Sequence, residues 1–300
     1  MTGLALTSRR AALAGIGLML AGVFLFSVND AVGKWLLATY SVGQLLLLRS
    51  ATTLILLSPL LWRAGASAFI GAPRPGLQLL RAVLSTLEVA MFFWAVSYMP
   101  LADAITFYLA GPIYVTAFSV LLLRERVGWR RWTAVLVGFA GVVVALRPSA
   151  ATLTLPALIA LAGSVIYAML MITTRVVKET SDVVLMTSQF FGTFVFGAIA
   201  APFGWVTPTA YDMIFLSGFG AISIVALFCI NRSLKLAPAS VVVPYQYTLL
   251  LWAVVLGYLM FGDVPDRFTL IGSAIIVASG LYIFWREQIA ARATVFDPAP

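Results

Sequence analysis

Ten long apolar segments follow one another along almost the whole chain, so lipid must be its main surroundings. Each is near the roughly 20 residues that cross the hydrocarbon of a bilayer as a helix. The connections are short, and no stretch has the composition of a soluble domain. The sequence therefore predicts an all-α membrane protein with ten transmembrane helices, centred near Val23, Thr53, Leu87, Ile113, Val137, Val165, Thr193, Ile222, Leu251 and Val277.

Composition excludes several functional classes. The 300 residues are 62% hydrophobic and 10% charged, whereas a soluble domain is roughly a quarter charged. The chain has no His and one Cys, Cys229, so we expect no catalytic residues of the His-triad kind, no metal site and no internal disulfide. It lacks the phosphate-binding loop of an ATP-driven pump. We expect no cofactor and no nucleic-acid partner, because the net charge of +8 is attributed to membrane-flanking loops.

The distribution of basic residues predicts the orientation. Cytoplasmic loops of membrane proteins collect Lys and Arg. With the N-terminus inside, fifteen of the nineteen basic residues fall in cytoplasmic segments, three fall outside, and Arg49 lies within the second span. The opposite orientation would invert this bias. We therefore expect a multi-pass protein in the lipid of the cell inner membrane, with both termini cytoplasmic.

Two loops in similar surroundings carry opposite charge. Residues 124–131 hold four basic residues and one acid, a net +3, whereas residues 262–267 hold one basic residue and two acids, a net −1. Both follow a long apolar run and lead into another. Because basic residues mark cytoplasmic loops, equivalent loops of opposite charge indicate one repeat inserted twice in opposite orientations.

Matching spacings support the same repeat. Pro100 precedes Glu125 by 25 positions, and Pro238 precedes Asp263 by the same 25. Five spans are an odd number, so two tandem copies must face opposite ways. We expect substrate to bind near the membrane midplane where the repeats meet, with alternating access between the two sides. The sequence predicts a first five-helix repeat over 12–148 and an inverted second repeat over 153–287.

The run from Glu125 to Gly138-Phe139-Ala140-Gly141, together with the ten spans, resembles the drug/metabolite transporter superfamily. The similarity is closer to its EamA-type ten-helix transporters and covers roughly residues 12–287. Within these, the chain is most similar to YddG-type aromatic amino-acid exporters. That resemblance implies a secondary transporter, not an enzyme, that exports aromatic and other neutral amino acids; the oligomeric state is left open.

A second resemblance points to another substrate. The segment Phe26–Asp30 with Lys34 is similar to branches of the superfamily assigned to riboflavin or S-adenosylmethionine uptake. Uptake of a larger aromatic metabolite is therefore the alternative. In both cases the expected partner is a small molecule, an amino acid or a related metabolite.

Several ionisable residues lie inside predicted spans, where a charge is costly and usually functional. Asp30 has Lys34 at i+4 on the same helix face, and Arg49 is expected at a similar depth in the second span. The favoured interpretation is a structural ion cluster of Asp30, Lys34 and Arg49, with substrate contact as the alternative. Asn29 can bind a neighbouring helix or the substrate.

Glu88 lies near the middle of the third span. Its nearest base in that span is Arg81, seven residues back, and no other base is predicted at its depth. Such residues mark substrate or proton pathways, and a glutamate bonded to a neighbouring backbone or hydroxyl group is the alternative. An alternative from another class of protein is a membrane-embedded enzyme that uses Glu88 or Asp30, although no second carboxylate is expected close to Glu88.

Aromatic side chains gather in the third, fourth and ninth spans, and the fourth is expected to kink at Gly111-Pro112. Such a lining suits a substrate with an aromatic or apolar body and a polar handle. Packing against lipid or other helices is the alternative for each ring. The predicted substrate-binding set is Asn29, Glu88, Phe92, Trp94, Phe107, Tyr108, Tyr245, Gln246 and Trp252.

Overall fold

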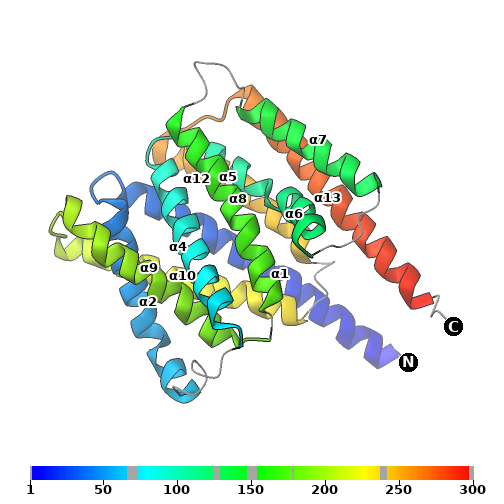
Figure 1. Ribbon diagram of the computed structural model, residues 1–300, viewed down its shortest axis with the longest axis horizontal. Coiled ribbons are helices and arrows are strands. Elements are labelled where there is room, and N and C mark those ends of the chain that lie inside the picture. Colours follow the sequence, from blue (N-terminus) through cyan, green and yellow to red (C-terminus); the bar gives the residue numbers. More distant parts are fainter. Residues whose placement is uncertain are drawn as a thin grey trace.

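The computed structural model describes residues 2–65, 73–123, 129–146, 154–177, 179–236 and 242–296, and the regular structure in these ranges is helical (Figure 1). In chain order the elements are α1 (Thr2–Leu36), α2 (Val42–Ala64), α4 (Pro75–Val96), α5 (Leu101–Leu109), α6 (Gly111–Leu123), α7 (Trp129–Leu146), α8 (Leu155–Val176), α9 (Asp182–Ala200), the 3-10 turn η1 (Ala201–Gly204), α10 (Ala210–Leu236), the 3-10 turn η2 (Val243–Tyr247), α12 (Thr248–Phe261) and α13 (Arg267–Phe296).

Every predicted span centre falls within a helix, so the predicted fold class is confirmed. Six helices of the described chain are long and apolar enough to cross a membrane: α1, α2, α4, α8, α9 and α10. The other four spans are shorter apolar segments, formed by α5 with α6, by α7, by η2 with α12, and by α13. The predicted repeat bounds at 148 and 153, the charged loop residues 124–128 and Pro238 lie outside the described residues.

Local sequence explains several helix ends. The Ser41 hydroxyl accepts a hydrogen bond from the backbone N–H of Gln44 (3.3 Å) and so caps α2. Gly262, with φ of +69°, ends α12 in the left-handed region that favours glycine. These two ends flank the α1–α2 connection and the α12–α13 connection.

The helices form two groups. In the six-helix group, α1 packs along α10, α2 along α9 and α10, and α4 along α8 and α9. In the four-span group, α7 lies beside α13, and this pair contacts α5 and α6 (Figure 1). The first group takes spans 1–3 and 6–8, and the second takes spans 4, 5, 9 and 10. Each group therefore receives the same spans from both expected repeats.

The fourth and ninth spans are interrupted. α5 ends at Leu109 and α6 begins at Gly111, just before Pro112, so the predicted kink is a break in the helix. The ninth span breaks between η2 and α12, which begins at Thr248. The spacing that relates Pro100 to Pro238 relates Ala110 to Thr248, so the two breaks fall at equivalent positions of the predicted repeats. Both lie three residues before the predicted span centres, deep in the bundle.

The start of α1 and the end of α13 lie on the same side of the bundle (Figure 1), as an even number of crossings requires. Which side is cytoplasmic stays a prediction from the loop charges. A reporter fused after Arg292 should give an intracellular signal, and one inserted near Thr209 an extracellular signal.

Close packing between α10 and α2 depends on Gly220. A Cβ atom at this position would lie 2.7 Å from the carbonyl oxygen of Arg49 and 3.0 Å from the Cβ of Thr52. Two residues earlier on the same helix, a Cβ at Gly218 would meet nothing within 4 Å. Gly220 therefore sets the helix separation that positions Arg49.

We expect Gly220→Ala to destabilise the protein by about 1–3 kcal/mol, because the added methyl group must push the backbone of α2 away. Gly218→Ala is the matched control, and it should leave stability unchanged or raise it slightly. Thermal unfolding of both variants in the same detergent measures the difference. Equal transition temperatures would show that α10 and α2 do not pack this closely.

Candidate functional site

Arg49 is a buried cation on α2, with 9% of its surface exposed. Its Nε donates a hydrogen bond to the hydroxyl of Ser223 on α10 (3.2 Å). Its guanidinium carbon lies 4.9 Å from the ring centre of Phe219, also on α10. The rings of Phe93 and Phe190 are 5.8 and 6.0 Å away. Helices α4, α9 and α10 thus surround Arg49 with aromatic faces that stabilise a cation.

Two carboxylates share the electrostatic environment of Arg49. Asp30 on α1 and Glu88 on α4 both interact with Arg49 through their charges, and Glu88 also interacts with Asp30. Both acidic residues are half-buried rather than fully enclosed. This set of two acids and one base is called here the charge cluster.

The prediction that Glu88 has neither a base nor a second carboxylate at its depth is therefore wrong. Asp30 lies six residues before the end of α1, Arg49 seven residues after the start of α2, and Glu88 eight residues before the end of α4, and these three helix ends lie at the same end of the bundle. At about 1.5 Å per residue these distances place them at nearly the same depth. Spacing within one span does not report such neighbours from other spans.

Aromatic residues of the third, fourth and sixth spans pack around Tyr108, which contacts the backbone of Glu88. The Tyr108 hydroxyl donates a hydrogen bond to the backbone carbonyl of Glu88 (3.2 Å). The ring of Tyr108 packs edge to face on Phe92, with centres 5.2 Å apart, and lies 6.1 Å from the ring of Tyr167. Phe107 is buried in the same hydrophobic core. The break that follows Leu109 lies directly beside these rings.

The other predicted aromatic residues lie elsewhere. Tyr245 and Trp252 pack in a separate cluster around Met19 and Val23, in the middle of α1. Trp252 lies edge to face with Phe24 at 4.8 Å.

Two further candidates complete the predicted set. Trp94 packs on Tyr98, which is 67% exposed near the end of α4. Gln246 is half-buried in η2. The structure thus brings Glu88, Phe92 and Tyr108 together with Asp30 and Arg49, whereas Trp94, Tyr245 and Trp252 make their contacts elsewhere.

Asn29 contacts a neighbouring helix, one of its two predicted alternatives. Its Nδ2 donates to the carbonyl of Phe219 (2.8 Å) and to the hydroxyl of Ser223 (3.1 Å). Within the described residues its Oδ1 has no hydrogen-bond partner. Ser223 therefore links Asn29 to Arg49. Sequence reasoning missed Phe219 and Ser223, although their i, i+4 spacing on α10 places an aromatic and a hydroxyl group on one face.

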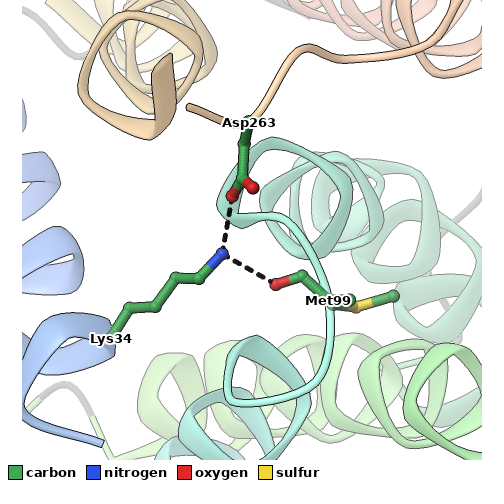
Figure 2. A network of polar contacts seen from close by, with 3 residues as sticks. All are labelled: Lys34, Met99 and Asp263. Atoms are coloured by element: carbon green, nitrogen blue, oxygen red, sulfur yellow. Dashed lines mark hydrogen bonds and ion pairs between the residues drawn. The ribbon is translucent and has the colours of Figure 1, made fainter. Parts of the chain in front are cut away.

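Lys34 does not join Asp30. Its Nζ forms an ion pair with Asp263 at 2.7 Å and donates to the carbonyl of Met99 at 3.1 Å (Figure 2). The predicted cluster of Asp30, Lys34 and Arg49 therefore loses Lys34 and gains Glu88. The physical reason is that Lys34 lies one turn nearer the end of α1 than Asp30, where its long side chain can reach a polar connection.

Fold and site together define a class of protein. Ten apolar spans, two of them interrupted near their predicted centres, and a charge cluster around the buried Arg49 beside one interruption are the architecture of a secondary transporter. The model of the EamA-like transporter family matches residues 13–147 and again residues 154–285. The chain belongs to this family. The alternative of a membrane-embedded enzyme has no support from these comparisons.

The relatives are transporters of several metabolites. The chain is 27% identical over 281 residues to an S-adenosylmethionine uptake transporter of Rickettsia bellii, covering 92% of this chain and 95% of the relative. It is 26% identical over 279 residues to a riboflavin transporter of Vibrio cholerae, covering 91% and 94%. It is 26% identical over 272 residues to a pseudopaline exporter of Pseudomonas aeruginosa, covering 88% and 94%.

A solved crystal structure shares the fold. It superposes with a TM-score of 0.58 at 18% identity, covering 90% of this chain and 94% of that chain. The family prediction is confirmed, whereas these comparisons do not single out the YddG-type exporters. The relatives include transporters named for S-adenosylmethionine and for riboflavin, the two substrates of the alternative interpretation.

Proposed function

We propose that the protein is a secondary transporter for a metabolite that combines positive charge, an α-amino-acid group and an aromatic ring, with S-adenosylmethionine as the representative substrate. The observation that carries the proposal is the charge cluster of Asp30, Arg49 and Glu88 within an aromatic surrounding. Arg49 offers its guanidinium to a substrate carboxylate. The two acids bind cationic groups, and the rings of Phe92 and Tyr108 offer faces for an aromatic base.

Charge balance favours this substrate class. The cluster offers two acids and one base, and S-adenosylmethionine carries two cationic groups, the sulfonium and the ammonium, and one carboxylate. A zwitterionic amino acid would pair with Arg49 and one acid and leave the second acid without a cationic partner. Riboflavin has no cation for either acid. A relative named for S-adenosylmethionine uptake points the same way.

Export of an aromatic amino acid is the second candidate. A zwitterion with a ring matches Arg49, one carboxylate and the aromatic set around Tyr108. Both candidates use alternating access, in which the four-span group and the six-helix group rock against each other around the site. The inner membrane and cytoplasmic termini, proposed from the loop charges, give such a carrier its two compartments.

Uptake into proteoliposomes tests the proposal. We expect saturable accumulation of labelled S-adenosylmethionine in vesicles that contain the protein and none in protein-free vesicles. Labelled tryptophan and riboflavin are measured in parallel. Transport of tryptophan without S-adenosylmethionine would select the second candidate, and transport of riboflavin alone would contradict the charge-balance argument.

A further inference from the structure

We infer that Lys34 and Asp263 form a latch that holds one entrance to the transport path closed, at the end of the bundle where α1 ends. Asp263 follows α12, in the connection to α13. The Lys34 ammonium lies 2.7 Å from the Asp263 carboxylate, 3.1 Å from the Met99 carbonyl and 4.7 Å from the ring centre of Phe261. The two charged side chains are only 15% and 25% exposed.

The latch joins the two helix groups. Lys34 belongs to α1 of the six-helix group, and Asp263 belongs to the α12–α13 connection of the four-span group. Figure 2 shows the Lys34 side chain extending from its helix across to this connection and to the chain between α4 and α5. Motion of one group against the other at this end must therefore break the contact.

Two other residues at this end, Tyr40 and Gln44, make polar contacts within the six-helix group. The Tyr40 hydroxyl donates to Asp212 at the start of α10 (2.7 Å). The Gln44 side chain both donates to the Val206 carbonyl and accepts from its N–H (2.6 and 3.0 Å). These contacts fix the α1–α2 connection to the α9–α10 region and would survive a movement of the four-span group. Lys34 differs from them because its partner belongs to the other group.

The latch lies directly beyond the charge cluster. Lys34 follows Asp30 by four residues on the same face of α1, about 6 Å further along the axis. A closed latch therefore covers the route from Asp30 to the α1–α2 end of the bundle. Opening exchanges one well-formed ion pair for hydrated charges, so the balance between open and closed states is sensitive to either residue.

The inference requires alternating access but not the identity of the substrate, so it is tested without substrate. In a Cys229→Ser background, spin labels at Thr39→Cys and Leu270→Cys report the distance between the two groups by pulsed electron paramagnetic resonance in lipid vesicles. Thr39 is exposed beyond α1, and Leu270 is 48% exposed on α13. A second pair, Thr39→Cys and Tyr211→Cys, lies within the six-helix group and is the control.

We expect Lys34→Met and Asp263→Asn each to raise the ratio of long to short Thr39–Leu270 distances about tenfold, which corresponds to about 1.4 kcal/mol. The exchanged variant, Lys34→Asp with Asp263→Lys, should return the ratio toward that of the parent. The Thr39–Tyr211 distance should stay the same in all variants. Unchanged Thr39–Leu270 distances in both single variants, or an equal change in the control pair, would overturn the latch.

Discussion

Glu88→Gln is expected to leave the protein folded and to lower S-adenosylmethionine transport at least about tenfold, equivalent to about 1.4 kcal/mol. Glutamine keeps the volume of the side chain and its hydrogen bonding but removes its charge. The backbone contact with Tyr108 does not involve the side chain and should persist. Initial uptake rates in proteoliposomes of equal protein content measure the effect.

Glu179→Gln is the matched control for this substitution. Glu179 is exposed in the α8–α9 connection, so removal of its charge should leave both folding and uptake unchanged. Normal transport by Glu88→Gln would mean that Glu88 only fills space in the bundle. Loss of folded protein would instead assign it a structural partner and leave Asp30 as the better candidate for contact with substrate.

Arg49→Gln should have the largest effect on stability, about 3–5 kcal/mol, because it removes the cation that interacts with both Asp30 and Glu88. Asp30→Asn should cost less, since Glu88 still balances Arg49. The double variant should cost less than the sum of the two single variants, because a buried charge left alone is worse than a neutral pair. Folded yield after extraction and the thermal transition temperature measure the three variants.

Asn29→Asp changes the residue that precedes Asp30 on α1, for comparison with Asp30→Asn. It adds an acid beside Ser223 without removing Arg49, and it breaks the amide's donation to the Phe219 carbonyl.

Strictly additive losses for Asp30→Asn and Arg49→Gln would show that these two residues do not interact. The proposed charge cluster would then have to be abandoned as a unit.

The helical framework follows from the sequence because the thickness of the bilayer sets the length of each apolar run. The break near Pro112 was predictable for a similarly local reason, since proline cannot continue the hydrogen bonding of the preceding turn. The equivalent break before Thr248 was not predicted, although Pro244 lies close by. The spacing between Pro100 and Pro238, applied to Ala110, would have located this second break.

The charge cluster was only partly predictable. The sequence indicated that Asp30 and Arg49 lie at one depth. The number of residues between Glu88 and the end of its helix would have placed Glu88 at that depth too. The partner of Lys34 depends on the packing of α12 against α1, which no pattern within α1 encodes. For the same reason the rings of Tyr245 and Trp252, grouped by composition alone, turn out to pack around Met19.

The resemblance identified the family better than the substrate, and the structure explains why. Gly138 and Gly141, which carry part of the resemblance, pack against Ser279 and Ile275 of α13. These contacts hold α7 to α13, far along the chain from Asp30 and Arg49. They therefore report the fold shared by the family and contain no information on what the charge cluster binds.

The most direct measurement compares two ligands that differ in one charge. S-adenosylhomocysteine keeps the adenosine and amino-acid groups of S-adenosylmethionine but lacks the sulfonium. We predict that the protein in lipid nanodiscs binds S-adenosylmethionine at least about tenfold more tightly by calorimetry, and that Glu88→Gln removes most of this preference. Equal affinities for the two ligands in the unmodified protein would contradict the assignment of Asp30, Arg49 and Glu88 as a site for a cationic substrate.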